Sequence, residues 1–258
     1  MDTIIRGVNL GGWLVLEKWM KPELFNGTDA VDETTFSQAL PRAELEARLR
    51  AHRDSFITEE DFAWIAAAGL NTVRLPVPWW LFGQAAPLVG CTDYVRKAFT
   101  WADKYGLRVM LDLHCAPGCQ NGFDNGGIAG VMDWHRDPAN IRATLDVLDE
   151  LCRFVKPFSA LASIQLLNEP HWDIPIDVVK RFYVQGYAIV RRYFRPEECA
   201  VVLHDSFRQD LWEDFLPDGE NVLMDAHFYQ FQQEYEGSDY FRHAEETLRN
   251  RRENLRLL

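Results

Sequence analysis

An apolar run that ends on a carboxylate occupies residues Ile164–Trp172, which read IQLLNEPHW. Glu169 precedes a proline, so its side chain comes at the point where a strand must stop. Hydrolysis of a glycosidic bond requires an acid that protonates the leaving oxygen and a second carboxylate that faces the anomeric carbon. We predict Glu169 as the proton donor and expect burial and a nearby anion to raise its pKa. The alternative is a structural strand end, in which Asn168 and Glu169 satisfy loop backbone groups.

Other polar side chains stand within or at the ends of similar apolar runs. The amide of Asn168 suits a substrate 2-hydroxyl, where a hydrogen bond strengthens in the transition state. Arg74 lies inside an apolar run, so it should pair with a carboxylate, either as a structural salt bridge or to orient a nucleophile. His114 and His227 each end a run, and a metal bound by them and Glu169 is an alternative. No H-E-x-x-H motif is present, so neither a metal nor a cofactor is expected.

Aromatic residues gather near the same run ends, and the faces of pyranose rings pack well against aromatic planes. These residues are Trp13, Trp19, Trp79, Trp80, Phe123, Trp134, Trp172, Phe228, Tyr229 and Phe231. Several of them must belong to the core instead, and Trp64 and Trp101, which lie within helical patterns, are assigned to it. The clustering favours a carbohydrate-binding cleft.

Six short apolar runs are predicted as β-strands, and longer segments of helical pattern lie between them. The strands are expected at residues 3–10, 71–77, 107–114, 163–169, 199–205 and 221–229. The helices are expected at residues 58–69, 92–106, 137–155 and 177–194. Thr58 and Thr92 are the predicted caps of the first two helices, and Gly69 and Gly106 their stops. Because the strand runs are apolar on both faces, they favour a parallel sheet that is covered on each side.

Alternating strands and helices occur both in open doubly wound sheets and in closed (β/α)8 barrels. A dinucleotide-binding doubly wound sheet predicts G-x-G-x-x-G before a helix, and the glycines of residues 7–13 have another spacing. Polar residues end successive strands, and in a barrel these ends converge on one rim. We therefore predict a single TIM-barrel domain over residues 1–258, with only about six of the eight β/α units. Residues 241–258 resemble the helix after strand six, so the domain is expected to be C-terminally incomplete.

Composition limits the classes of partner. The net charge of −12 argues against binding to a nucleic acid, which depends on Lys and Arg contacts with phosphates. Five scattered cysteines fit reduced thiols better than a disulfide framework. No signal-like segment follows Met1, and no apolar run approaches the roughly 18 residues of a membrane span. We expect a cytoplasmic protein, or a secreted one if its N-terminus is processed.

Four longer motifs resemble glycoside hydrolase family 5, in its exo-β-1,3-glucanase-like branch. The motifs are RGVNLGGWLVLEKWMKPELF (6–25), DLHCAPGCQNGFDNGG (112–127), LLNEPHW (166–172) and DAHFYQF (225–231). They follow the family order over essentially the whole chain. The resemblance implies a (β/α)8 barrel that hydrolyses β-1,3-glucan or a related β-glucoside by a retaining double displacement.

The resemblance also implies a role for each matching residue. Glu169 would be the acid/base, and Asn168 would bind the 2-hydroxyl. Four residues would line the subsite at the cleaved bond: Arg74, His114, His227 and Tyr229. Glu17 would accept hydrogen bonds from the terminal sugar, while Phe123 and Asp124 would shape the cleft.

The chain departs from the family pattern in two places. Branch members often have Pro-Tyr where this chain has Lys18 and Trp19, so the stacking residue there differs. The family nucleophile is a glutamate at the end of strand seven, typically within Gly-Glu-Trp, and no such motif follows Tyr229. The glutamates beyond that tyrosine are not assigned as nucleophiles: Glu234, Glu236, Glu245, Glu246 and Glu253.

Three interpretations therefore stand side by side. The chain is an enzyme whose nucleophile lies on a missing seventh strand, a non-catalytic carbohydrate-binding remnant, or a fragment that requires its C-terminal part. Missing strands would expose two sheet edges and apolar surface. Dimerisation or a complementing fragment is the expected way to cover them.

Overall fold

The computed structural model describes residues 4–216, 218–229 and 249 of the chain. All six predicted strands are present in this part, and each is shorter than predicted. They are β1 (Gly7–Asn9), β2 (Thr72–Val77), β3 (Arg108–Leu113), β4 (Leu161–Gln165), β5 (Ala200–His204) and β6 (Val222–Asp225). The helix predicted at 241–258 lies outside the described residues, apart from position 249.

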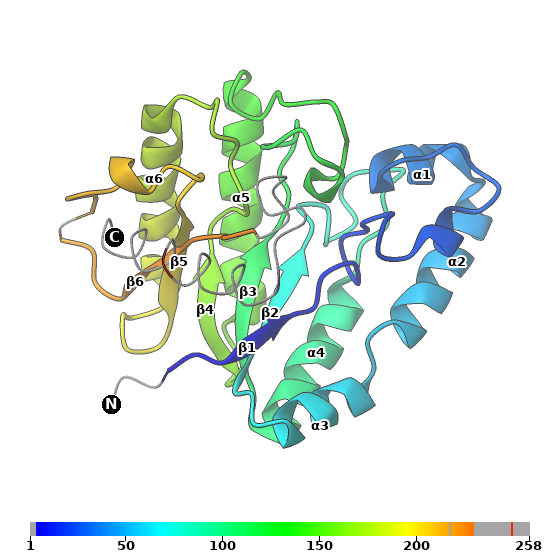
Figure 1. The fold of residues 1–258 in the computed structure, drawn as a ribbon, viewed down its shortest axis with the longest axis horizontal. Coiled ribbons are helices and arrows are strands. Elements are labelled where there is room, and N and C mark those ends of the chain that lie inside the picture. The colour runs from blue at the N-terminus through cyan, green and yellow to red at the C-terminus, as the bar shows by residue number, and fades with distance from the viewer. Residues whose placement is uncertain (1–3, 217, 230–248, 250–258) are drawn as a thin grey trace.

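The six strands form one parallel sheet in the order β1-β2-β3-β4-β5-β6 (Figure 1). A doubly wound sheet reverses its strand order at a switch point, whereas a barrel adds each strand next to the previous one. The described part is therefore a curled arc of six β/α-barrel strands, as the sequence predicts. Their carboxyl ends lie at one edge, where the polar residues are expected.

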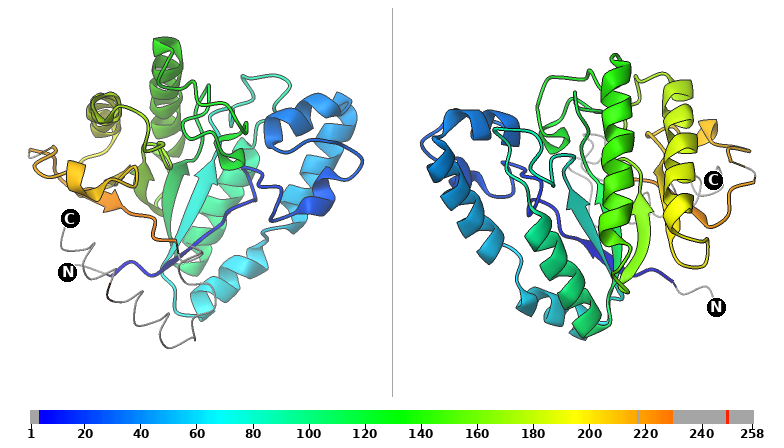
Figure 2. Two further views of the ribbon diagram at one scale, coloured as in Figure 1. Left: turned by 45° about the horizontal axis from the view of Figure 1, so that its top comes forward. Right: turned by 180° about the vertical axis from the view of Figure 1, so that it is seen from behind.

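Helices cover the outer face of this arc. They are α3 (Glu59–Ala67), α4 (Thr92–Tyr105), α5 (Pro138–Val155) and α6 (Ile176–Tyr193). Seen from behind, α5 and α6 run side by side against the sheet, with α4 next to them (Figure 2). In the part of the chain that the structure describes, no helix is both long and apolar enough to span a membrane.

The helix ends follow their local sequence. Thr58 and Asp61 form a capping box at the start of α3, which satisfies backbone N–H groups that have no partner within the helix. Helix α4 ends at Gly106, whose φ of 67° lies in the left-handed region that glycine tolerates best. Its predicted cap is displaced by one position, because Cys91 is the capping residue and Thr92 the first helical one.

Two helices between β1 and β2 have no counterpart among the predicted elements: α1 (Glu33–Ala39) and α2 (Arg42–Ser55). Helix α2 is mostly polar, and in its first turns only Leu45 and Leu49 are buried apolar residues. With so narrow an apolar stripe, the helical period is weak in the sequence. Three short 3-10 helices complete the fold: η1 (Pro22–Phe25), η2 (Asp124–Gly126) and η3 (Gln209–Leu211).

Tryptophans fill much of the core. Trp13, Trp80 and Trp134 are buried, so these members of the aromatic cluster are packing residues. Trp101 stacks on Trp13 and packs against the core, as predicted. The assignment of Trp64 to the core is wrong, because its side chain is 71% exposed. Helix α3 turns Phe62 and Ile65 inward, and a residue two positions after an inward one faces away.

Candidate active site

A cleft of about 250 Å³ lies at the carboxyl ends of the strands. It is lined by Asn9, Gly11, Glu17, Trp19, Met20, Arg74, His114, Asn125, Asn168, Glu169, His227 and Tyr229. The cleft thus brings together seven of the nine residues that the sequence singles out. Phe123 and Asp124 are not part of its lining.

Glu169 lies four residues beyond the end of β4 and is only 3% exposed. Its backbone φ is 43°, an uncommon value for a residue with a side chain, and it directs the carboxylate into the cleft. Oε1 accepts hydrogen bonds from His227 Nδ1 at 2.6 Å and from the Tyr229 hydroxyl at 2.5 Å. Oε2 accepts one from the Asn125 amide at 3.1 Å. Three donors from two loops therefore hold one carboxylate.

These donors correct the expected protonation state of Glu169. Burial favours the protonated acid, but the hydrogen bonds from His227 and Tyr229 and the charge of His227 outweigh burial. They hold the pKa of Glu169 well below its usual value, so the expectation of a raised pKa is wrong for this arrangement. Burial of Glu169 is visible in its sequence neighbours, whereas the two donors that meet on one of its oxygens are not.

His227 bridges two carboxylates. Its Nδ1 lies 2.6 Å from Glu169 and its Nε2 lies 3.1 Å from Asp225 Oδ2. Burial opposes the charged ring, but both carboxylates favour it, and together they raise the pKa of His227 to about 9. Both ring nitrogens donate only in the imidazolium form. The ring is therefore a cation between two anions at neutral pH.

A buried polar network forms the floor of the cleft. Arg74, from β2, donates from Nε and Nη2 to Gln165 Oε1, and from Nη2 to Asn168 Oδ1 at 2.7 Å. The same Nη2 lies 3.0 Å from Oδ2 of Asp112, which is fully buried. The carboxylate partner predicted for Arg74 is thus Asp112, which also lies 2.5 Å from His114 Nδ1.

Strand register explains why these side chains meet. Arg74 pairs with Asn9 across β1 and β2, and Asp112 pairs with Gln165 across β3 and β4. Asp225 lies opposite His204 across β5 and β6. Parallel strands carry such residues to one end of the sheet, so positions far apart in the sequence become neighbours.

Four residues of the network were missed by sequence reasoning: Asp112, Asn125, Gln165 and Asp225. Asp112 and Gln165 interrupt the apolar runs VMLDL and SIQLL. Polar residues inside a buried strand need partners, which is the argument that singled out Arg74. Asp112 and Gln165 carry the same signal in the sequence. Asn125 gives no comparable signal, because it lies in a polar loop.

Acidic and aromatic side chains lie in and near the cleft lining. Glu17 and Trp19 form one wall, where the Trp19 indole N–H donates to Glu17 Oε2 at 3.1 Å. Burial raises the pKa of Glu17 despite the opposing charge of His114. Outside the cleft lining, Phe123 is 41% exposed and its ring lies 6.3 Å from that of Trp172. Trp19 and Phe123 thus both present exposed aromatic rings, one within the cleft lining and one outside it.

Helix α1 ties the two wall loops together through its first turn. Glu33 Oε2 accepts the Leu16 N–H at 2.9 Å, one residue before Glu17. Asp32 Oδ2 accepts the Ala129 N–H at 2.9 Å, and the Thr34 hydroxyl donates to the Gly127 carbonyl at 2.6 Å. The β1 loop and the β3 loop are thus held by three consecutive side chains.

One group of potential metal ligands occurs in the described part of the chain, formed by Glu169, His204 and His227 within 4.8 Å of one another. His204 Nδ1 accepts the Ser206 N–H at 2.9 Å, so the proton of the neutral ring is on Nε2. His227 already donates from both nitrogens. A metal needs free lone pairs, so this trio in its present state does not fit one.

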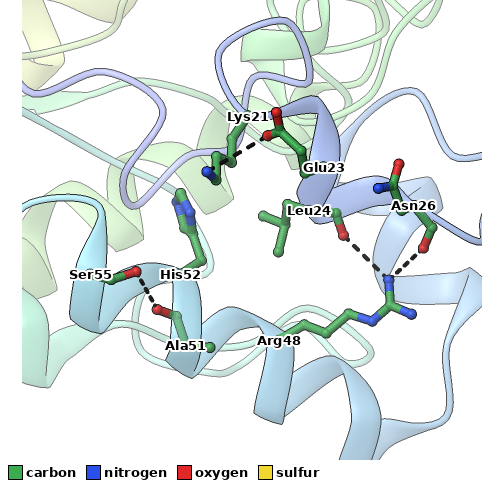
Figure 3. Close-up of a pocket in the computed structure, with 8 residues that line it drawn as sticks. All are labelled: Lys21, Glu23, Leu24, Asn26, Arg48, Ala51, His52 and Ser55. Carbon is green, nitrogen blue, oxygen red and sulfur yellow. Dashed lines mark hydrogen bonds and ion pairs between the residues drawn. The ribbon is translucent and has the colours of Figure 1, made fainter.

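A second cavity of about 480 Å³ opens between η1 and α2 (Figure 3). Arg48 at its edge donates to the Leu24 and Asn26 carbonyls, and Lys21 lies 3.6 Å from Glu23. His52 donates from Nε2 to Gly12 O at 2.8 Å in its neutral form. The charged side chains that line this cavity, Lys21, Glu23 and Arg48, thus have partners within the chain.

The family model for cellulase (glycosyl hydrolase family 5) matches residues 31–256. The chain belongs to glycosyl hydrolase family 5. Glucan 1,3-beta-glucosidase of Blumeria graminis is 42% identical over 240 residues, covering 88% of this chain and 55% of the relative. Probable glucan 1,3-beta-glucosidase A of Emericella nidulans is 43% identical over 238 residues, covering 88% and 57%. The family 5 chain thus spans about half the length of the curated relatives it matches.

Solved structures support the barrel architecture of this family 5 chain. The crystal structure of rutinosidase from Aspergillus niger matches it with a TM-score of 0.78 at 22% identity. The match covers 90% of this chain and 71% of the rutinosidase chain. At this identity the likeness shows the fold alone.

Proposed function

We propose that the cleft is the acid/base half of a retaining glycosidase site that acts on β-1,3-glucan or a related β-glucoside. The observation that carries the proposal is the Glu169 carboxylate, buried at the strand ends and held by His227, Tyr229 and Asn125. The names of the family 5 relatives support the β-glucan class of substrate. In this proposal Glu169 protonates the leaving oxygen and then activates a water.

The remaining cleft residues are proposed to hold the sugar at the cleaved bond. The Oδ1 atom of Asn168 is held by Arg74, while its Nδ2 is buried without a protein partner among the described residues. That amide is suited to donate to a sugar 2-hydroxyl. Glu17 accepts hydroxyl hydrogens on one wall, and Phe123 and Asp124 shape the opposite entrance. His114 is oriented towards the sugar by Asp112.

Proton transfer requires that Glu169 gain the proton that His227 holds in this arrangement. The two groups lie 2.6 Å apart and titrate as a pair. A nucleophilic carboxylate at about 5–5.5 Å, the separation found in retaining enzymes, would raise the pKa of Glu169. We assign this nucleophile to the end of a seventh strand, which is not among the six strands of the described residues. With that carboxylate present, the proton would transfer from His227 to Glu169, and Glu169 could then act as the acid.

The two edges of the arc are the proposed contact surface for a macromolecular partner. Gly7, Val8 and Asn9 of β1 are exposed, and so are Ile4 and Ile5 just before them. An edge strand presents unpaired N–H and C=O groups along its length. We propose that a second copy of the chain or a complementing polypeptide covers these edges.

The activity test compares this chain with a longer version that carries a Gly-Glu-Trp segment after it. Release of glucose from laminarin and from an aryl β-glucoside is measured for both. Glu169→Gln should lower the rate of the active form by about 10²–10⁴-fold, because it removes general acid/base catalysis. The control is Glu213→Gln, which changes an exposed glutamate outside the cleft lining and should leave the rate unchanged.

Two outcomes would contradict the enzymatic proposal. One is full activity of Glu169→Gln, and the other is an inactive longer version that is folded. Calorimetric titration with laminari-oligosaccharides then separates the alternatives. Binding without turnover favours a non-catalytic carbohydrate-binding module. A folded protein that binds no oligosaccharide excludes both the glycosidase and the binding module.

A further inference from the structure

His204 ends strand β5 and is absent from the residues that the sequence motifs single out. It is fully buried and lies opposite Asp225 in the β5–β6 register. Its ring meets that of His227 edge to face, with the centroids 4.4 Å apart and the planes at 88°. The buried His204 ring is therefore in direct contact with the His227 imidazolium.

His204 is neutral and has a defined tautomer. Burial and the neighbouring His227 cation lower its pKa to about 3. Nδ1 accepts the Ser206 N–H, so the ring proton resides on Nε2. Nε2 is buried and has no hydrogen-bond partner in the part of the chain that the structure describes. A buried donor without a partner is unfavourable, so packing alone does not explain an imidazole at this position.

The orientation of the His227 ring determines whether its two hydrogen bonds to carboxylates can form. Both of its N–H groups reach carboxylates only while the ring stays in one plane between Asp225 and Glu169. The side chain of His227 is 19% exposed, so part of its ring surface faces the open cleft. A neighbour that fills the inner side restricts the ring rotation that would break both hydrogen bonds.

We propose that His204 is a positioning residue that holds the His227 ring between Asp225 and Glu169. A neutral ring suits this place because a second cation beside His227 would repel it. The consequence for catalysis rests on the proposed function, since it concerns the acid/base Glu169. The consequence for the protonation of His227 does not, and it can be measured on the chain itself.

The structure also offers a competing explanation of His204. Ser206 and Phe207 have φ values of 53° and 56°, and the hydrogen bond from Ser206 N to His204 Nδ1 stabilises this turn. A histidine that serves only the turn would be replaceable by asparagine, whose side-chain oxygen accepts from the backbone two residues later. The two explanations therefore predict opposite effects for two substitutions.

The experiment compares His204→Phe with His204→Asn. Phenylalanine keeps a ring against His227 and removes the acceptor for Ser206, whereas asparagine keeps the acceptor and removes the ring. The measurement is a pH titration of the His227 imidazole by ¹H–¹⁵N NMR in each protein. The charged or titratable groups facing that ring are Glu169, His204, Asp205, Asp225 and Tyr229, and both variants retain the four other than His204.

The positioning role predicts that His204→Asn lowers the pKa of His227 by about one unit or more, a tenfold change in its protonation equilibrium. His204→Phe should retain a pKa close to that of the unmodified protein. The opposite pattern, or equal pKa values in all three proteins, would overturn the proposal. The unmodified protein gives a separate check if a variant does not fold. His204 must then stay neutral with its proton on Nε2 from pH 5 to 9, and any other state overturns the proposal.

Hydrolysis assays separate this inference from the proposed function. In the active longer form, His204→Asn should shift the pH profile of kcat relative to His204→Phe. If glucose release fails while the NMR pattern holds, the proposed function is wrong and the positioning of His227 stands. If glucose release is observed and the NMR pattern is absent, only the role of His204 is wrong.

Discussion

At the scale of single residues, buried charges in the cleft are compensated in pairs. Arg74 is 14% exposed at its side chain and Asp112 is fully buried, and their nitrogen and oxygen lie 3.0 Å apart. Arg74 additionally orients Gln165 and Asn168. Removing one member of a buried pair leaves an uncompensated charge, which is more unfavourable than the pair was favourable.

Arg74→Met tests this dependence through stability. We expect the free energy of unfolding to fall by about 3–5 kcal/mol, because Asp112 then keeps, among the described residues, only His114 as a side-chain partner. Urea unfolding followed by circular dichroism measures the change. Arg136→Met removes an exposed pair with Asp133 and should lower stability by no more than about 1 kcal/mol. Equal losses in the two variants would contradict a structural role of the Arg74 pair.

At the scale of elements, the first turn of α1 connects the loops that carry the cleft walls. Glu33 is fully buried, and burial raises its pKa to about 7 although Arg53 and the Leu16 N–H oppose the rise. A group with a raised pKa stabilises the fold below its unfolded pKa of 4.5 and loses this contribution as pH rises through its folded pKa. The contribution of Glu33 to the free energy of unfolding should therefore fall from acid to neutral pH, because the buried carboxyl must then ionise.

Glu33→Gln tests how the contribution of Glu33 to the free energy of unfolding depends on pH. Glutamine keeps an acceptor for the Leu16 N–H but carries no charge at any pH. We expect the unmodified chain to lose on the order of 2 kcal/mol more stability than the variant between pH 5 and pH 8. Urea unfolding at both pH values measures the difference. Parallel pH profiles of the two proteins would show that Arg53 keeps Glu33 ionised throughout.

At the scale of the whole molecule, the described residues form an arc of a barrel rather than a closed one. Strand β1 pairs only with β2, and β6 only with β5, in the part of the chain that the structure describes. A closed barrel has no such edges. The exposed residues around β1 give this edge an apolar character, which favours association.

We expect the fraction of associated chains to rise with protein concentration. Size-exclusion chromatography with light scattering, at concentrations from micromolar to hundreds of micromolar, measures the mass. Val8→Lys places a charge on the β1 edge and should reduce association. Val184→Lys, at a position 47% exposed on α6, is the matched control and should leave the mass unchanged. A mass independent of concentration would contradict the proposed self-association.

The sequence by itself determined the parallel six-strand order, the positions of Glu169, Arg74 and His227, and the membership in family 5. Apolar runs and helix caps act over a few residues, so their pattern is visible without coordinates. Helix α2, the exposure of Trp64 and the carboxylate partner of Arg74 depended on the tertiary structure.

The protonation state of Glu169 was decided only by the tertiary structure. Its sequence neighbours indicate a buried acid, whereas His227 and Tyr229 reach it from another strand end. A pKa depends on the balance between burial and donors within a few ångströms, and those donors lie about sixty residues away along the chain. The sequence thus located the carboxylate, and the sheet order that brings His227 and Tyr229, which follow β6, to Glu169 set its charge.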